Sequence, residues 1–235
     1  MFWMSMLALA APGERLKVEA PCGDIRIIGG SKEIVVNRDA KVKRGKIVFD
    51  GPCEKFEIRV PRKTRLDIES LEANLEILNT LGDIDFESIS GDIQVWGNVR
   101  PRSIEASTIS GDLRIETSPD GDVTLSSVTG STTVTGGPAV SVQVQSVNGP
   151  IDLFLELDPT GRLEAMSHDG VIRLTLPDEP AQFELRTLSG KVDEVLGPND
   201  KGPVIELETF SSDIVLQPKE PADPKTDEEL PTEPE

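Results

Sequence analysis

The sequence predicts an all-β fold: a single-chain parallel β-solenoid of about eight coils, with an N-terminal β cap and a disordered acidic C-terminal tail. Three observations lead to this prediction. A glycine slot recurs every 18 to 22 residues, a hydroxyl side chain stands three residues before each slot, and apolar residues alternate on both sides of it. Alternation is the period of half-buried strands, and a fixed repeat of this length is typical of stacked coils.

The first expected element is a leader at residues 1–11. These residues are apolar and end in small side chains before Pro12, as in the distal half of a secretory signal peptide, although a basic segment is missing. The stretch is too short to span a bilayer as a helix. We therefore expect an exported chain that is periplasmic, at the cell surface or secreted, with no transmembrane segment in its mature form.

Residues 12–65 are expected to form the β cap and a first coil. Residues 16–27 fit the columns of the later repeats, and alternating stretches follow at 33–36, 41–43, 46–49 and 55–60. Cys22 and Cys53 each follow a proline at a turn, and in an exported chain we expect them to form a disulfide.

Residues 66–217 contain the eight repeats. Because a corner needs a positive φ or a close backbone approach, glycine is expected there. The corner glycines are Gly91, Gly111, Gly130, Gly149, Gly170 and Gly190, with Ala73 and Ser212 in the same slot at the ends. The hydroxyl column is Ser70, Ser88, Thr108, Ser127, Ser146, Ser167, Thr187 and Thr209, and it is expected to satisfy corner carbonyls and amides.

A further column lies two residues before each slot. It contains Leu71, Ile89, Ile109, Val128, Val147, His168, Leu188 and Phe210. We expect this mostly apolar column in the core, so that Ile109→Ala and Val128→Ala would each cost about 2 to 4 kcal/mol. Phe210→Ala is expected to fray the C-terminal end of the stack locally.

The charge of the chain is strongly negative and unevenly distributed. The 24 Lys and Arg against 42 Asp and Glu give a net charge of −18, which excludes a generic nucleic-acid binder. Residues 1–65 carry 14 − 8 = +6, residues 66–235 carry 10 − 34 = −24, and the Pro-rich stretch 218–235 is expected to be a disordered tail. The cap cations include Lys41, Lys43, Arg44, Lys46, Arg62 and Lys63. They would either hold anionic polymers or lipid headgroups, or neutralise nearby acids of the first coils.

The residue chemistry does not favour catalysis. There is no Tyr, and the single histidine, His168, is only adjacent in sequence to Ser167 and Asp169, which does not make a triad. The outward acids Asp67, Asp85, Glu105, Glu164, Glu184 and Glu206 are interpreted as solvated ladders, with weak calcium binding as an alternative. We therefore predict no catalytic residue, no cofactor and no metal ligand.

Several of these motifs together resemble a known family. Residues 22–27 (CGDIRI), residues 56–61 (FEIRVP) and the Ser-Gly-Asp-Ile pattern at 88–93 and 108–113 are similar to the bacterial adhesin family called domain of unknown function 4097. The resemblance runs from about Leu16 to Gln217. It implies an exported or envelope-associated β-solenoid without established catalytic residues.

The function we expect is that of a non-enzymatic, structural or adhesin-like interaction module of the bacterial cell envelope. Its partner would be an envelope or surface component of unknown identity. Two alternatives stay open: a carbohydrate-active β-helix enzyme, and a scaffold that polymerises end to end through an uncapped coil at Ser212 to Gln217.

Overall fold

The computed structural model describes residues 5–7, 14–37, 40–43, 45–49, 52–117, 121–177, 180–194, 199 and 201–218, and its regular elements there are all β-strands. Most of the expected leader, Arg44 and the expected tail beyond Pro218 lie outside these residues. The strands are β1 (Ser5–Leu7), β2 (Arg15–Gly29), β3 (Ile34–Val36), β4 (Lys41–Lys43), β5 (Lys46–Val48), β6 (Lys55–Val60), β7 (Arg65–Leu78), β8 (Ile84–Ser90), β9 (Ile93–Trp96), β10 (Ser103–Ser110), β11 (Leu113–Glu116), β12 (Asp122–Thr129), β13 (Thr132–Ser146), β14 (Ile151–Ser167), β15 (Ile172–Leu176), β16 (Gln182–Thr187), β17 (Val192–Glu194), β18 (Val204–Thr209) and β19 (Ile214–Pro218).

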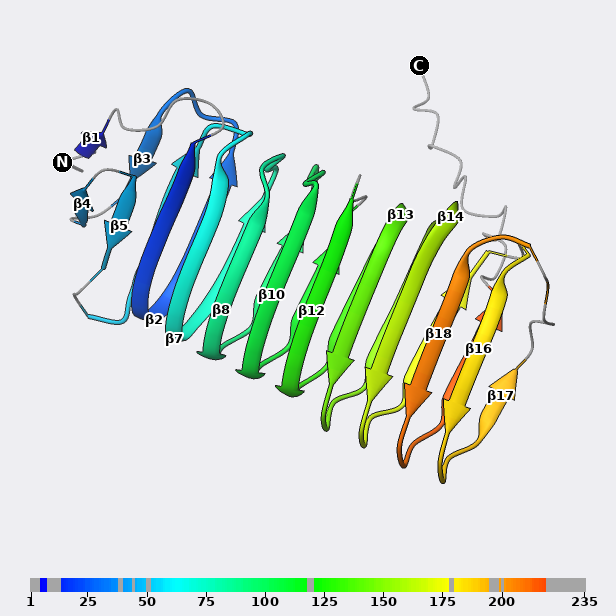
Figure 1. Ribbon diagram of the computed structural model, residues 1–235. Helices are drawn as coiled ribbons and strands as arrows, with labels where there is room; N and C mark the ends of the chain where they lie inside the picture. Colours follow the sequence, from blue (N-terminus) through cyan, green and yellow to red (C-terminus); the bar gives the residue numbers. More distant parts are fainter. Residues whose placement is uncertain are drawn as a thin grey trace, which may run out of the picture.

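The strands form two parallel ladders that face each other across one core (Figure 1). The first ladder contains the segments that lead into a glycine corner, in the spatial order β5, β2, β7, β8, β10, β12, β13, β14, β18, β16. The second contains the segments that leave the corner, in the order β6, β2, β7, β9, β11, β13, β14, β15, β19, β17. The long strands β2, β7, β13 and β14 run through a corner and contribute to both ladders.

The core consists of the alternating apolar columns found in the sequence. In the first ladder, Ile84 lies opposite Ile104, which lies opposite Val123, and all three are buried. Because each coil is buried by the coils on both sides, a repeat that could not bury its apolar face alone is stabilised by its neighbours. This register agrees with the columns expected from the glycine slot.

The order of coils at the C-terminal end differs from the order in the sequence. Strand β18 lies between β14 and β16, and β19 lies between β15 and β17 (Figure 1). The expectation that Ser212 to Gln217 form an open end is therefore wrong, because that coil is internal. The more apolar coil takes the doubly buried place: its second strand has Leu216 where the coil of β17 has Glu194.

The N-terminal end of the stack is closed by antiparallel strands. After β1, the chain forms β2, continues through β3, β4, β5 and β6, and then returns to pair β7 with β2. Strand β4 pairs with β5, β3 pairs with β6, and β1 pairs with β3, all antiparallel. Residues 5–7 of the expected leader thus form β1, and export stays a prediction.

A disulfide and an aromatic contact join parts of this closed end. Cys22 and Cys53 are disulfide-bonded, with their Cα atoms 5.0 Å apart. The rings of Phe49 and Phe56, both buried, lie 4.0 Å apart between centroids. Phe49 and Phe56 therefore belong to the same core as the repeats.

The corners show why glycine and hydroxyl residues recur. Gly130 has a φ of 118°, and a Cβ atom there would lie 2.2 Å from the carbonyl oxygen of Gly111 in the previous coil. The hydroxyl of Ser88 donates to the carbonyl of Ser90 at 2.8 Å, and the hydroxyl of Ser167 accepts from the amide of Gly170 at 2.8 Å. The hydroxyl column thus satisfies corner carbonyls and amides, as the sequence predicted, except at Ser70, whose buried Oγ has no hydrogen-bond partner among the described residues.

Candidate interaction surface

The most distinctive surface feature is a row of exposed apolar side chains along one edge of the stack. It is formed by the column two residues before each corner, and we call it the exposed column: Leu71, Ile89, Ile109, Val128, Val147, Phe210 and Leu188, with His168 between Val147 and Phe210. The exposed fraction of its apolar members ranges from 39% at Val128 to 72% at Leu188. Since only scattered apolar residues are normal on a protein surface, a continuous row points to an interaction site.

The expected burial of this column is wrong, and the parity of the strand explains why. Side chains alternate between the two faces of a strand, so the residue next to the buried hydroxyl of Ser127 must face outward. Ile109 is 52% exposed and Val128 39% exposed, although both lie in the middle of the stack. The inward position of the hydroxyl column was the signal in the sequence that could have placed its neighbours outside.

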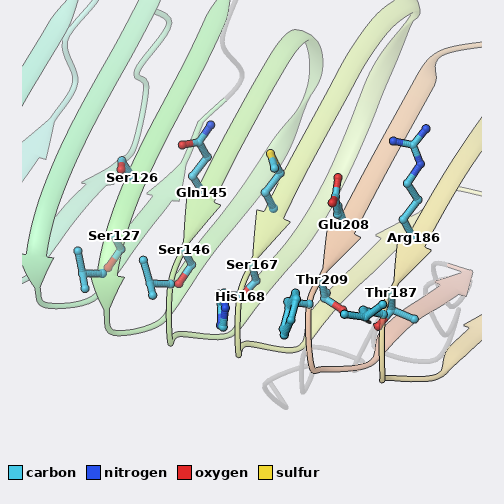
Figure 2. A pocket seen from close by; sticks show the side chains of 15 residues that line it. Ser126, Ser127, Gln145, Ser146, Ser167, His168, Arg186, Thr187, Glu208 and Thr209 are labelled. Atoms are coloured by element: carbon cyan, nitrogen blue, oxygen red, sulfur yellow. Dashed lines mark hydrogen bonds between the residues drawn. The ribbon is translucent and has the colours of Figure 1, made fainter.

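The C-terminal half of the exposed column borders a shallow groove of about 700 Å³ (Figure 2). Val128, Val147, His168, Phe210 and Leu188 form its apolar part. Ser126, Gln145, Met166, Glu208 and Arg186, which face outward from the same strands, form its other side. The groove is thus an apolar strip with a mostly polar margin.

The placement of β18 next to β14 shapes this groove. It brings Phe210 beside His168, although 42 residues separate them in the sequence. The two rings are stacked, with centroids 4.8 Å apart. The imidazole ring of His168 thus fills the place in the exposed column between Val147 and Phe210.

The groups around His168 do not form a nucleophilic site. The His168 Nδ1 lies 3.1 Å from the Asp169 Oδ1, and the hydroxyl of Ser211 donates to the same carboxylate oxygen. These two hydrogen bonds hold the pKa of Asp169 below its usual value, the contact with Ser211 having the larger effect. A serine nucleophile needs the imidazole as its direct partner, whereas here the carboxylate lies between them.

The acids at the corners have a structural role. The Oδ1 of Asp92 accepts from the amide of Asp112 at 2.9 Å, and the Oδ1 of Asp112 accepts from the amide of Ser131 at 2.7 Å. Each carboxylate is therefore used to bond the next coil. The described residues contain no group of three or more His, Cys, Asp or Glu that could hold a metal ion.

Cations of the N-terminal coils are partly used in ion pairs with nearby acids. Lys46 lies 2.6 Å from Glu19, and Lys17 lies 2.5 Å from Glu69. These contacts lower the pKa of Glu19, chiefly through Lys46, and raise the pKa of Lys17, chiefly through Glu69. The pairing of Lys46 favours neutralisation over ligand binding at this position.

The other basic residues expected at an anionic surface are not brought together by a described contact. Arg62 and Lys63 are exposed in the turn between β6 and β7. Lys41 and Lys43 lie on β4, and their side chains, like the whole of Arg44, are outside the described part of the chain. Binding of anionic polymers or lipid headgroups by this set stays a prediction.

Comparison with known families agrees with the repeat architecture. The family model described as Toastrack DUF4097 matches residues 38–202, which is more than half of the chain. The chain belongs to the Toastrack family. The match covers the six corner glycines and all of the exposed column except Phe210.

Other comparisons add little about function. A solved protein from Clostridium sporogenes, described as a "putative cell adhesion protein", is similar at 11% sequence identity, with 92% of this chain and 98% of that chain covered. Its TM-score of 0.28 is too low for any argument to rest on it. No curated protein matches the Toastrack chain significantly. In the described residues, no helix has the length and apolar character needed to cross a membrane.

Proposed function

We propose that this Toastrack protein is a non-enzymatic interaction module that is exported and acts in the bacterial cell envelope. The observation that carries the proposal is the exposed column, a row of seven apolar side chains and His168 along one edge of the stack. Leaving these side chains in water does not stabilise the fold. A partner that buries them would gain binding free energy from the apolar surface removed from water.

The partner that fits this row is a polypeptide segment with its own row of apolar side chains. With coils about 4.8 Å apart, the eight members of the exposed column span about 34 Å, the length of an extended segment of about ten residues. The column is one residue wide and has the exposed hydroxyl of Ser126 beside it, which suits a hydrogen bond to a peptide backbone. An anionic lipid surface fits less well, because residues 66–235 carry a charge of −24.

The alternative of a carbohydrate-active enzyme has weaker support. Such enzymes stack sugar rings on aromatic side chains and use two opposed carboxyl groups. Trp96 is 40% exposed, but its indole nitrogen donates to Glu76 at 3.1 Å on the second ladder, away from the groove. In the groove, His168 and Phe210 are stacked on each other, which occupies one face of each ring.

A peptide selection followed by titration tests the proposal. Random peptides are displayed against the immobilised full chain, and the enriched peptides are then measured by calorimetry. We expect peptides with alternating apolar residues. The triple variant Ile89→Ser, Ile109→Ser, Val128→Ser should bind them at least tenfold more weakly, because the apolar contact area is lost.

A matched control uses polar positions that face outward on the same strands. The double variant Glu105→Gln, Thr124→Ala changes exposed positions of β10 and β12 that do not line the groove, and it should keep the affinity of the original chain. The proposal is wrong if no peptide is enriched, if the triple variant binds equally well, or if vesicles of anionic lipid bind in place of peptides. Turnover in a panel of polysaccharides would instead support the enzyme alternative.

A further inference from the structure

The outermost strands differ between the two ends of the stack. At the N-terminal end, antiparallel strands cover the outer edges of β5 and β6, and Ile47 and Ile58 are completely buried. At the C-terminal end, β16 pairs only with β18 and β17 only with β19 among the described strands (Figure 1). An edge strand of this kind presents a row of backbone donors and acceptors to any strand that can pair with it.

The core side chains at the C-terminal end are also incompletely covered. Phe183 and Leu185 point inward from β16 but are only partly buried, whereas their register partners Ile205 and Leu207 on β18 are buried. The last core layer therefore lacks a covering layer in the described part of the chain.

The backbone direction of β16 defines which groups are free to pair. The amide of Gln182 donates to the carbonyl of Pro203 at 2.9 Å, so the backbone groups of Gln182 point toward β18. Along a strand this direction alternates. The amide and carbonyl groups of Phe183, Leu185 and Thr187 consequently point to the open side.

The outward side chains of β16 make this edge complementary to itself. Glu184 and Arg186 flank Leu185, are both exposed, and form an ion pair with each other in the single chain. If two copies of β16 pair antiparallel with Leu185 opposite Leu185, each Glu184 faces the Arg186 of the other copy. Opposite charges placed directly across a strand pair are stabilising, and the same patch on both copies is what a two-fold interface requires.

We propose that two copies of this chain associate end to end through antiparallel pairing of their β16 strands, centred on Leu185. In this register the free backbone groups of Phe183 meet those of Thr187 in the second copy. The two cores become continuous, and Phe183 and Leu185 are covered. Because the pairing occupies the β16 edge of both copies, this interface closes at two copies rather than growing into a fibre.

Charge exchange on β16 tests this pairing in the full chain. By sedimentation velocity, the original chain should show a species of twice its 25.5 kDa mass. Arg186→Glu places four like charges across the interface and should raise the dissociation constant at least tenfold. The double exchange Glu184→Arg, Arg186→Glu restores opposite pairs in the same register and should recover the dimer.

A control variant and circular dichroism separate this effect from misfolding. Arg114→Glu changes the same kind of exposed arginine on β11, far from the end, and should leave the dimer intact. A chain that stays monomeric at high concentration, larger assemblies that grow with concentration, or a double exchange that fails to recover the dimer would each overturn the proposal. The peptide selection on the exposed column is a separate measurement and can fail or succeed independently.

Discussion

Two isoleucines on one strand allow a sharp test of which columns form the core. Ile104 and Ile109 both lie on β10, but Ile104 is 0% exposed and Ile109 is 52% exposed. Ile104→Ala removes a fully buried side chain between two coils and should cost about 3 to 5 kcal/mol, because a cavity is left behind. Complete burial of an isoleucine side chain stabilises a fold by about 1.5 to 3 kcal/mol. Ile109 is only about half buried, and alanine keeps part of its contacts, so Ile109→Ala should cost about 1 kcal/mol or less.

Urea unfolding followed by far-ultraviolet circular dichroism measures both variants. The midpoint should fall strongly for Ile104→Ala and slightly for Ile109→Ala, with similar slopes. Because the two variants carry the same substitution on the same strand, each is the control for the other. Equal losses of stability in the two variants would refute the assignment of the Ile109 column to the surface.

Three further predictions concern the corners, the cap and the ion pairs. Gly130→Ala should cost about 3 kcal/mol or more, because its Cβ would lie 2.2 Å from a carbonyl oxygen. Gly30→Ala, with a φ of 122° but a Cβ in ordinary contact with Arg62 at 3.8 Å, should cost about 1 to 2 kcal/mol in thermal unfolding. Replacing Cys22 and Cys53 with Ser should lower stability by about 3 to 4 kcal/mol in the chain-entropy treatment of a 31-residue separation, and thiol titration of the unreduced protein under denaturant should find no free thiol. The pKa of Glu19 is lowered in the folded chain, so its contribution to stability is present above the carboxyl's unfolded pKa and is lost as the pH falls through its folded pKa. A pH series of thermal midpoints should therefore show less acid sensitivity in Glu19→Gln than in the original chain.

Much of the fold could be predicted because one physical pattern is repeated. Each coil must place a small residue at the corner, a hydroxyl beside it and apolar residues at alternating positions, so the same columns recur and their register follows. Gly111 and Gly130 stack as the slot predicts, with the oxygen of one close to where a side chain of the other would lie. The internal position of β18 could not be predicted from spacing, because the spacing is the same whichever coil is outermost.

The candidate site was less predictable, for two reasons. An apolar residue beside a corner looks like core in the sequence, and only the parity set by the inward hydroxyl of Ser127 places Val128 outside. The stacking of His168 on Phe210 depends on the exchanged order of the last coils, which brings distant segments together. The pairing of Lys46 with Glu19 was open in the sequence and required the side-chain geometry.

Hydroxyl-radical labelling read by mass spectrometry tests the central claim that the exposed column binds a partner segment. The chain is labelled alone and in the presence of a peptide enriched by display. Leu71, Ile109 and Phe210 should be labelled in the free chain, while Ile104 should stay unlabelled, and the peptide should protect the three exposed side chains. If these three side chains are not labelled in the free chain, or if the bound peptide does not reduce their labelling, the account is contradicted.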